Sequence, residues 1–166
     1  MSDVSPSDFK AALSRFASGV TVVTAKDAEG DHGMTASAFS SLSLDPPLVL
    51  VCVGRKARMH AILSEAGSFA INILAEDQTS VSNRFAGWWE EGRSKWADLS
   101  VAPAPKTGAA WIGGALANLD CHVHATYDGG DHTLFVGRVV AARVPDNSDP
   151  APLLYFSGSY RNLSPR

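Results

Sequence analysis

The spacing of apolar residues along the chain changes from a helical repeat near the start to strand-like runs further on. Near the start, apolar side chains recur every three or four residues: Phe9, Ala12, Leu13 and Phe16. Ser5 precedes this repeat as an N-cap residue, Pro6 takes the first helical position, and Gly19 follows the last turn. We therefore expect a helix between Ser5 and Gly19 with one apolar face.

Segments rich in β-branched and apolar residues come next, and they predict strands over 20–25, 33–44, 48–53 and 68–74. The polar stretch 26–33 carries two glycines and predicts a hairpin turn between the first two strands. Asp45-Pro46-Pro47 ends the second strand, because proline interrupts strand hydrogen bonding. The near-continuous hydrophobicity of 48–53 predicts a strand that is buried on both faces.

Helical spacing returns over 57–66 and 76–87, and the second of these segments ends at Gly87. The stretch 88–115 contains all four tryptophans, and no regular element is expected there. The last third predicts three more strands, with a turn at 128–132 between the first two: 115–128, 132–144 and 152–160. Many strands, few helices and several hairpins favour a mainly β fold, an antiparallel barrel with a few packed helices.

Composition supports a single soluble domain spanning 1–166. The chain has 166 residues, of which 45% are hydrophobic and 19% charged, and these proportions are ordinary for a globular protein. Its net charge of −3 gives no attraction to nucleic acid or to an anionic membrane. No stretch reaches the ~18 apolar residues that span a bilayer, and the start lacks the apolar core of a signal peptide.

The two cysteines, Cys52 and Cys121, lie in apolar or strand-like runs. Disulfides are rare in the reducing cytoplasm. We therefore expect a cytoplasmic protein in which both residues are buried free thiols.

The strand expected over 33–44 alternates small, hydroxylated and apolar residues. One face would carry Thr35, Ser37, Phe39, Ser41 and Ser43, and the other would carry Ala36, Ala38, Ser40, Leu42 and Leu44. Small side chains let a planar ring approach the backbone, whose N–H and C=O groups can bond the polar edge of the ring. The same pattern also fits a half-exposed strand whose serines meet water.

Positive charge follows the next strand. Gly54 is succeeded by Arg55, Lys56 and Arg58 at the entry to the helix of 57–66, where backbone N–H groups and guanidinium forks favour phosphate. A solvated basic loop is the alternative. Together the two segments predict a site with a flat end and a charged end. The chain contains neither a G-x-G-x-x-G nor a P-loop motif, so neither explains the phosphate preference.

Five stretches, taken in order, resemble the successive motifs of the flavin reductase family: FASGVTVVTA, GMTASAFSSLSLDPPLVLVCVGRKARMH, FAINILAEDQTSVSNRFAG, GGDHTLFVGRV and PLLYFSGSYRNL. Members of this family are small FMN-binding split-barrel proteins, and many are the NAD(P)H:flavin oxidoreductase partners of two-component aromatic monooxygenases. The resemblance runs from about residue 9 to residue 163. It implies a homodimer with a Greek-key split barrel.

The resemblance also implies roles for individual residues. Those implied along the isoalloxazine ring and ribityl chain are Thr35, Ala36, Ser37, Ser40 and Ser41. Those under the flavin are Cys52, Val53 and Gly54, and those near its phosphate are Arg55, Lys56 and Arg58. The segment that helps to close the flavin site contributes Asn83, Arg84, Phe85 and Gly87. His132 belongs to the motif associated with nicotinamide binding, and the C-terminal motif reaches the same region with Tyr160 and Arg161.

Two features leave the choice between FMN and FAD open. The phosphate loop is more cationic and poorer in hydroxyls than in relatives, which often carry Ser or Thr there. The tryptophan-rich segment 88–111 falls in a variable region of the family. It could cover the flavin, the nicotinamide or the dimer interface.

Several of the implied residues also have plainer explanations. His132 and Asp131 lie in a turn, where exposed histidines occur and aspartates shape the backbone. Cys52 fits packing better than redox chemistry, since no second thiol or pKa-lowering context is evident. His122 and His124 share a strand face, but no third ligand stands nearby in sequence, so we expect no metal site.

The expected activity is NAD(P)H:flavin oxidoreduction, with NADH rather than NADPH as donor and FMN or FAD as acceptor. Hydride would pass from nicotinamide C4 to flavin N5, with His132 helping to seat the nicotinamide. Reduced flavin would then reach a partner monooxygenase or react with oxygen. Two alternatives stay open: a non-catalytic flavin- or haem-binding sensor, and an enzyme like pyridoxamine-phosphate oxidase, which shares the general barrel.

Overall fold

The computed structural model describes residues 4–89, 91–146 and 151–163. Its helices are α1 (Pro6–Leu13), α2 (Arg58–Ala66) and α3 (Thr79–Phe85), with the 3-10 turn η1 (Glu76–Gln78) before α3. The strands are β1 (Ser18–Gly19), β2 (Thr21–Asp27), β3 (Gly30–Ala36), β4 (Phe39–Leu44), β5 (Pro47–Gly54), β6 (Ser68–Ile73), β7 (Val101–Pro103), β8 (Ala110–Ile112), β9 (Ala117–Gly129), β10 (His132–Arg143), β11 (Leu154–Phe156) and β12 (Ser159–Arg161).

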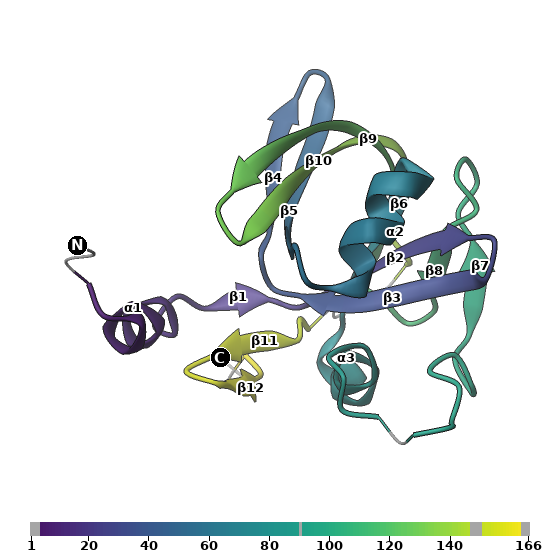
Figure 1. Ribbon diagram of the computed structural model, residues 1–166. Helices are drawn as coiled ribbons and strands as arrows, with labels where there is room; N and C mark the ends of the chain where they lie inside the picture. The colour runs from purple at the N-terminus through teal and green to yellow at the C-terminus, as the bar shows by residue number, and fades with distance from the viewer. Residues whose placement is uncertain (1–3, 90, 147–150, 164–166) are drawn as a thin grey trace.

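One antiparallel sheet forms the body of the molecule (Figure 1). Its strand order is β3-β2-β6-β9-β10-β5-β4, so the two end strands are consecutive in sequence. Only Ser37 and Ala38 connect β3 to β4, and the sheet therefore curls round until its ends meet at this connection. Among the described strands, β3 and β4 are not paired with each other, which leaves the barrel split there. The mainly β, antiparallel barrel expected from the sequence is confirmed.

The helix α2 closes the barrel interior and supplies part of its core. Met59, Ile62 and Leu63, which the sequence places on one side of this helix, are all buried. They belong to a cluster with inward-facing side chains of the strands: Val23, Val51, Val53, Phe69, Ile71, Cys121 and Phe135. Burial of one such side chain stabilises the fold by roughly 1.5–3 kcal/mol. This packing fixes which face of β5 points inward and which is left for the outer surface.

The first helix begins where the sequence predicts but ends earlier. The Asp8 backbone N–H donates to Ser5 Oγ at 3.1 Å, which confirms Ser5 as the N-cap residue. The helix stops at Leu13, well before Gly19, and the chain is extended by Ser18 to pair with β11. The apolar face of α1 is exposed, and Figure 1 shows the helix standing apart from the barrel.

The segment 33–44 is two strands, so the expectation of one continuous strand is wrong. The strand β3 pairs with β2, whereas β4 pairs with β5 after the bend at Ser37 and Ala38. A register shift between Ser41 and Ser43 interrupts the alternation again. Because of the bend, one segment serves both ends of the barrel, and the two predicted faces do not persist along it.

The strand β5 is buried on one face only, which corrects the expectation of burial on both. Its inward-facing residues are Val49, Val51 and Val53. The alternate residues Leu48, Leu50 and Cys52 are only partly buried. Their apolar character is explained by a cavity that lies over the outer face of β5 and is lined by Leu50 and Cys52.

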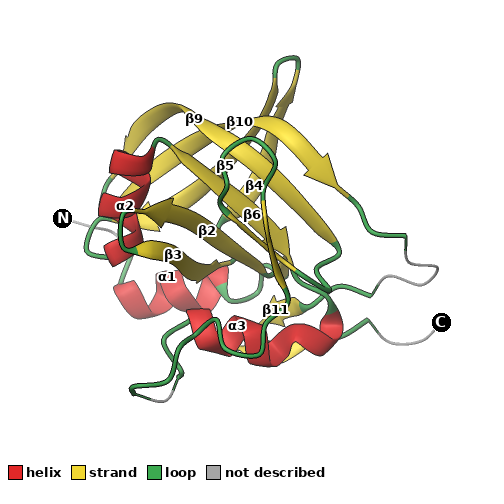
Figure 2. Ribbon diagram, turned by 90° about the vertical axis from the view of Figure 1, so that its right-hand side faces the viewer, coloured by secondary structure: helices red, strands yellow, loops and turns green. Residues whose placement is uncertain are grey.

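The C-terminal segment 152–160 is a hairpin, and the expected single strand is wrong here too. The chain reverses at Ser157 and Gly158, which both have positive φ, and β11 then pairs with β12. Figure 2 shows β11 and α3 together at the bottom of the barrel. The C-terminal hairpin and α3 therefore lie at the same end of the barrel.

The tryptophan-rich stretch, for which no element is expected, contains the short hairpin β7–β8. Buried Asp120 anchors the turn of this hairpin to the barrel. The carboxylate accepts hydrogen bonds from the Lys106 backbone N–H at 2.8 Å and from Thr107 Oγ1 at 2.6 Å. The chain around the hairpin is irregular, as the sequence indicates.

Both cysteines are free thiols. Cys121 is buried, and burial raises the pKa of its thiol to about 12, whereas Cys52 is only half-buried. Within the described residues, no helix has the length and hydrophobicity needed to cross a membrane.

Candidate functional site

A cavity of about 790 Å³ opens beside the bend between β3 and β4. The bend and the start of β4 line it with Ser37, Ala38, Phe39 and Ser40, and β5 adds Leu50 and Cys52. The remaining lining includes α1 and C-terminal residues: Lys10, Leu13, Phe16, Tyr155, Phe156 and Gly158. The volume is in the range of small-molecule and cofactor sites. The small residues that were expected to admit a planar ring therefore border a cavity that is large enough for one.

A second hollow of about 310 Å³ lies further along β5. Cys52 and Gly54 are two residues apart, so they lie on the same outward face of the strand. The second hollow is lined by Gly54, Arg55, Lys56, Ala57, Asp131 and His132. The cationic loop and His132, which are far apart in sequence, are thus brought together at the end of β5.

His132 stands opposite Gly54 in the pairing of β10 with β5. A Cβ built on Gly54 would lie 3.7 Å from His132 Nε2, so the glycine keeps the space next to the ring open. His132 Nδ1 is 2.7 Å from Asp131 Oδ1, and this hydrogen bond holds the pKa of Asp131 below its ordinary value. The charged carboxylate fixes the ring and leaves Nε2 on the side of the hollow.

Arg55 is tied to the turn between β9 and β10. Its Nη2 donates to Asp128 Oδ2 at 2.9 Å, and its Nε donates to Gly130 O at 3.0 Å. A hydrogen bond from the Gly130 backbone N–H, followed by the charge of Arg55, lowers the pKa of Asp128. Asp128 therefore offsets part of the charge of Arg55. Lys56 makes no hydrogen bond or ion pair with any described residue, so its charge remains available to an anion in the hollow.

A third, smaller hollow of about 180 Å³ shares Ser37 and Tyr155 with the large cavity. A chain of hydrogen bonds forms its wall. Thr35 Oγ1 donates to Ser82 O at 2.6 Å, and Ser82 Oγ is 2.8 Å from the hydroxyl of Tyr160. The Tyr160 hydroxyl donates to Asn83 Oδ1 at 2.9 Å. These bonds hold β3, α3 and β12 together beside the bend.

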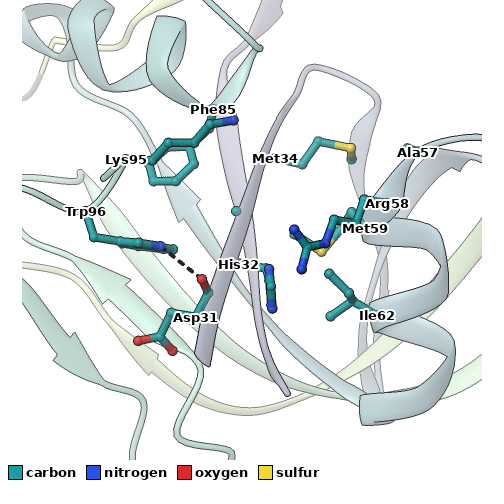
Figure 3. Close-up of a pocket in the computed structure, with 11 residues that line it drawn as sticks. Asp31, His32, Met34, Ala57, Arg58, Met59, Ile62, Phe85, Lys95 and Trp96 are labelled. Atoms are coloured by element: carbon teal, nitrogen blue, oxygen red, sulfur yellow. Dashed lines mark hydrogen bonds between the residues drawn. The ribbon is translucent and has the colours of Figure 1, made fainter. Parts of the chain in front are cut away.

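A fourth pocket of about 320 Å³ lies between the edge of β3 and the first turn of α2 (Figure 3). Arg58 lines it and donates from Nη2 to Glu29 Oε2 at 2.7 Å. Phe85 and Trp96 line the other side in Figure 3. Gly33 has no side chain at the point where the Phe85 ring crosses β3, since a Cβ there would lie 2.6 Å from the ring. Arg58 and Phe85, both predicted from the sequence as site residues, thus line this pocket and not the large cavity.

The structure places the remaining sequence-predicted residues outside the cavity walls. Ala36 is buried, and its carbonyl accepts from Thr21 Oγ1, while Val53 points into the core. Ser41 is exposed beyond Ser40, and Arg161 is exposed on β12.

Arg84 contacts the tryptophan-rich segment, and Gly87 lies in the turn after α3. Arg84 donates from Nη1 to Ala97 O at 2.6 Å, and its guanidinium lies 4.3 Å from the ring centroid of Trp89. Gly87, with φ of 96°, allows the turn that follows α3. The contacts described for Arg84 are therefore with other residues of the protein.

Sequence reasoning missed several residues of the site. The register of β9, β10 and β5 brings Asp128 next to Arg55. The glycine turn at 128–132 was a usable sequence signal for a residue at this position. Ser82 lies one position before Asn83, which the motif did identify. The cavity residues of α1 and of the C-terminal hairpin gave no local signal, because only the tertiary fold brings them there.

A curled antiparallel barrel with neighbouring hollows, one of them large enough for a cofactor, and with a cationic end has the features of a nucleotide-cofactor-binding protein. Comparison with known proteins makes this specific. The family model described as a flavin reductase like domain matches residues 13–164. The chain therefore belongs to the flavin reductase-like family, and the family resemblance stated from its motifs is confirmed.

Individual relatives agree with this assignment. The chain is 44% identical over 167 residues to an NADH-dependent flavin reductase of Rhodococcus sp, covering 97% of this chain and 88% of the relative. It is 44% identical over 159 residues to the 4-hydroxyphenylacetate 3-monooxygenase reductase component of Thermus thermophilus, covering 93% and 95%. The structure of Streptomyces globisporus NADH:FAD oxidoreductase SgcE6 in complex with NAD and FAD fragments superposes with a TM-score of 0.88 at 35% identity, covering 99% and 98%.

Proposed function

We infer that this protein is an NADH-dependent flavin reductase that transfers hydride from NADH to FMN or FAD. The observation that carries this conclusion is the close similarity, over nearly the whole chain, to enzymes of that named activity. The activity and cofactors predicted from the motifs are confirmed at this level. The likeness to a monooxygenase reductase component supports delivery of the reduced flavin to a partner monooxygenase.

The large cavity and the hollow further along β5 suit the two substrates of this reaction. We assign the isoalloxazine ring to the large cavity, against Ser37, Ala38 and Ser40, with Cys52 on its apolar side. The small side chains let a ring approach the backbone of the bend, whose N–H groups can bond its polar edge. The flavin phosphate is assigned to Lys56 and the start of α2, which has no side-chain cap to occupy its N–H groups.

When bound, the flavin accepts hydride at N5, and the nicotinamide supplies it from C4. The chain needs no acid or base for that step, and its residues act by position and charge. His132, held by Asp131, borders the hollow next to the flavin cavity and is assigned to seat the nicotinamide. The backbone of the bend and the nearby cations stabilise negative charge that develops on the flavin.

The direct test adds FMN, and then FAD, to purified apo-protein and follows NADH absorbance. Flavin-dependent loss of NADH is expected, and the faster flavin identifies the preferred acceptor. Tight flavin binding without NADH oxidation would favour the sensor or the oxidase instead. Absence of both binding and turnover would contradict the assignment of the cavities.

His132→Ala should raise the KM for NADH more than it weakens flavin binding, because the imidazole is assigned to the nicotinamide, whereas the flavin phosphate is assigned to Lys56 of the same hollow. Steady-state kinetics at saturating flavin and a flavin titration of the same variant measure the two effects. His124→Ala, at an exposed histidine of β9, is the matched control and should change neither value. Equal losses of NADH and flavin affinity in His132→Ala would contradict the role of His132.

We further propose that this single domain, 1–166, works as a cytoplasmic homodimer. The exposed apolar face of α1, with Phe9 and Leu13, and the exposed Phe16 just after the helix support the dimer. Leu13 and Phe16 also line the flavin cavity, so a second copy packed on α1 would lie at its border. The cytoplasmic assignment rests on two free thiols and on a reaction that uses NADH.

A further inference from the structure

The pocket between β3 and α2 differs in chemistry from the flavin cavity. It combines two aromatic rings, Phe85 and Trp96, with the cationic side chains of Arg58 and Lys95, and Asp31 is the one acidic residue among the described residues that line it. Figure 3 shows the aromatic rings on one side of β3 and the first residues of α2 on the other. Its volume of about 320 Å³ is at the lower end of small-molecule sites. An aromatic wall facing positive charge fits a base that is attached to a phosphate.

We propose that this pocket binds the adenosine monophosphate half of a dinucleotide, FAD, and thereby makes FAD the preferred flavin. The inference rests on the proposed function, since it requires the isoalloxazine half of the same molecule in the adjoining cavity. It also gives the tryptophan-rich segment, which supplies Trp96 and Lys95, a role in choosing between FMN and FAD.

The aromatic wall is held in place by packing and by one hydrogen bond. Trp96 Nε1 donates to Asp31 O at 2.9 Å, which fixes the indole against the edge of β3. The rings of Phe85 and Trp96 are 4.8 Å apart between centroids. Phe85 is itself buried in the cluster between α3 and the barrel. Phe85 therefore supports the indole from behind, and a rigid aromatic face such as that of Trp96 binds nucleobases by stacking, with little dependence on base identity.

Positive charge lies on both sides of the pocket, with Arg58 across from the rings and Lys95 next to Trp96. Arg58 keeps its guanidinium there although Glu29, exposed at the β2–β3 turn, offsets part of its charge. Lys95 makes no hydrogen bond or ion pair with any described residue. The N-terminus of α2 adds N–H groups without a side-chain cap. A phosphate placed between Arg58 and Lys95 would meet donors from both sides.

The pocket adjoins the cationic hollow at Ala57 and reaches toward the flavin cavity along β3. Ala57 lines both this pocket and the cationic hollow to which the flavin phosphate is assigned. Gly33 of β3 lines the pocket, and Ser37, four residues on and just after the end of β3, lines the flavin cavity, a span of about 13 Å in extended chain. A dinucleotide whose ring is at Ser37 and whose first phosphate is at the start of α2 therefore directs its adenosine half toward Trp96.

The test compares FAD and FMN affinities by calorimetry on apo-protein. Trp96→Ala should weaken FAD binding about tenfold, the effect of losing one stacking face, and should change FMN binding by less than about twofold. Trp89→Ala is the matched control, because Trp89 belongs to the same segment and lines none of the four hollows described here. It should leave the ratio of the two affinities unchanged. Equal weakening of FAD and FMN in Trp96→Ala, or no weakening, would overturn the proposal.

A second arm identifies the source of the adenosine phosphate, since NADH carries the same group. With FMN as acceptor, the KM for NADH should be unchanged in Trp96→Ala. A tenfold rise in this KM, with unchanged FAD affinity, would assign the pocket to NADH and overturn the FAD assignment. Lys95 is exposed, so we expect Lys95→Met to leave the fold intact. This variant should also weaken FAD binding severalfold without affecting FMN binding. Wild-type reduction of FMN by NADH tests the proposed function independently of these variants.

Discussion

The hydroxyl of Tyr160 joins three separate parts of the site. It lies 2.8 Å from Ser82 Oγ and 2.9 Å from Asn83 Oδ1, and Ser82 in turn accepts a hydrogen bond from Thr35 through its carbonyl. Ser82 is fully buried, so its hydroxyl has no access to water. The motif resemblance implied that Tyr160 reaches the nicotinamide region of the cofactor site, but its hydroxyl is already hydrogen-bonded to two protein groups. We therefore expect Tyr160 to act on the flavin through the position of β3 and α3.

Tyr160→Phe should destabilise the protein by about 1–3 kcal/mol, because it leaves the buried hydroxyl of Ser82 without its partner. Urea unfolding measures the change, with Tyr127→Phe as control, since Tyr127 is 61% exposed. The flavin dissociation constant should rise severalfold at the same time, as Thr35 and Ser37 lose their fixed position. Unchanged stability in Tyr160→Phe would show that the three contacts are not coupled through this hydroxyl.

At the scale of elements, the pairing of β5 with β10 assembles the nicotinamide end of the site. It places Gly54 opposite His132 and brings Arg55 to the turn that contains Asp128 and Gly130. The lowered pKa of Asp128 has two separable causes, the Gly130 backbone N–H first and the Arg55 charge second. Since the folded pKa is lowered, both contacts stabilise the turn above the ordinary range of aspartate. They lose that effect as pH falls below about 4.

Arg55→Gln should raise the pKa of Asp128 but leave it below its ordinary value, because the larger cause, the Gly130 N–H, remains. Carbon-13 NMR titration of the aspartate carboxyl groups measures this shift. Asp131 serves as the internal control, since its pKa is lowered chiefly by His132 rather than by Arg55. A pKa of Asp128 that does not move, or one that moves together with that of Asp131, would contradict the assigned causes.

The elements also show how far the sequence could predict the site. Local patterns located the N-cap Ser5, the helix α2 and the turn at 128–132, because each depends on neighbours in the chain. The break of 33–44 into β3 and β4 depends instead on pairing with two distant strands, which alternation does not encode. Motif resemblance supplied Tyr160 and Asn83 but no contact between them. The pocket at Trp96 arises from tertiary packing of Phe85 and Gly33, which no local pattern reveals.

At the scale of the whole molecule, the barrel is packed inside but leaves an apolar surface at its N-terminal end. Phe9, Leu13 and Phe16 of this region are 56%, 59% and 80% exposed, although α1 has the spacing of an amphipathic helix. Among the described residues of the chain, none covers this apolar face of α1. An amphipathic helix gains most of its stability from packing of its apolar side. A second copy of the chain accounts for both the exposed face and the open border of the flavin cavity.

Phe9→Glu should therefore weaken self-association without unfolding the barrel. Phe9 lies outside the core and does not line the flavin cavity, so the substitution acts on the expected interface alone. Sedimentation velocity should give twice the 17.5 kDa chain mass for the wild type, and a dimer dissociation constant raised about tenfold or more in Phe9→Glu. Val144→Glu, at an apolar residue 77% exposed just beyond β10, is the control and should remain dimeric. A wild type that stays monomeric at high concentration, or equal effects of the two variants on the dimer dissociation constant, would contradict the homodimer. If the dimer holds, flavin affinity should fall in step with dissociation, because Leu13 at the end of the same helix and Phe16 just after it border the flavin cavity.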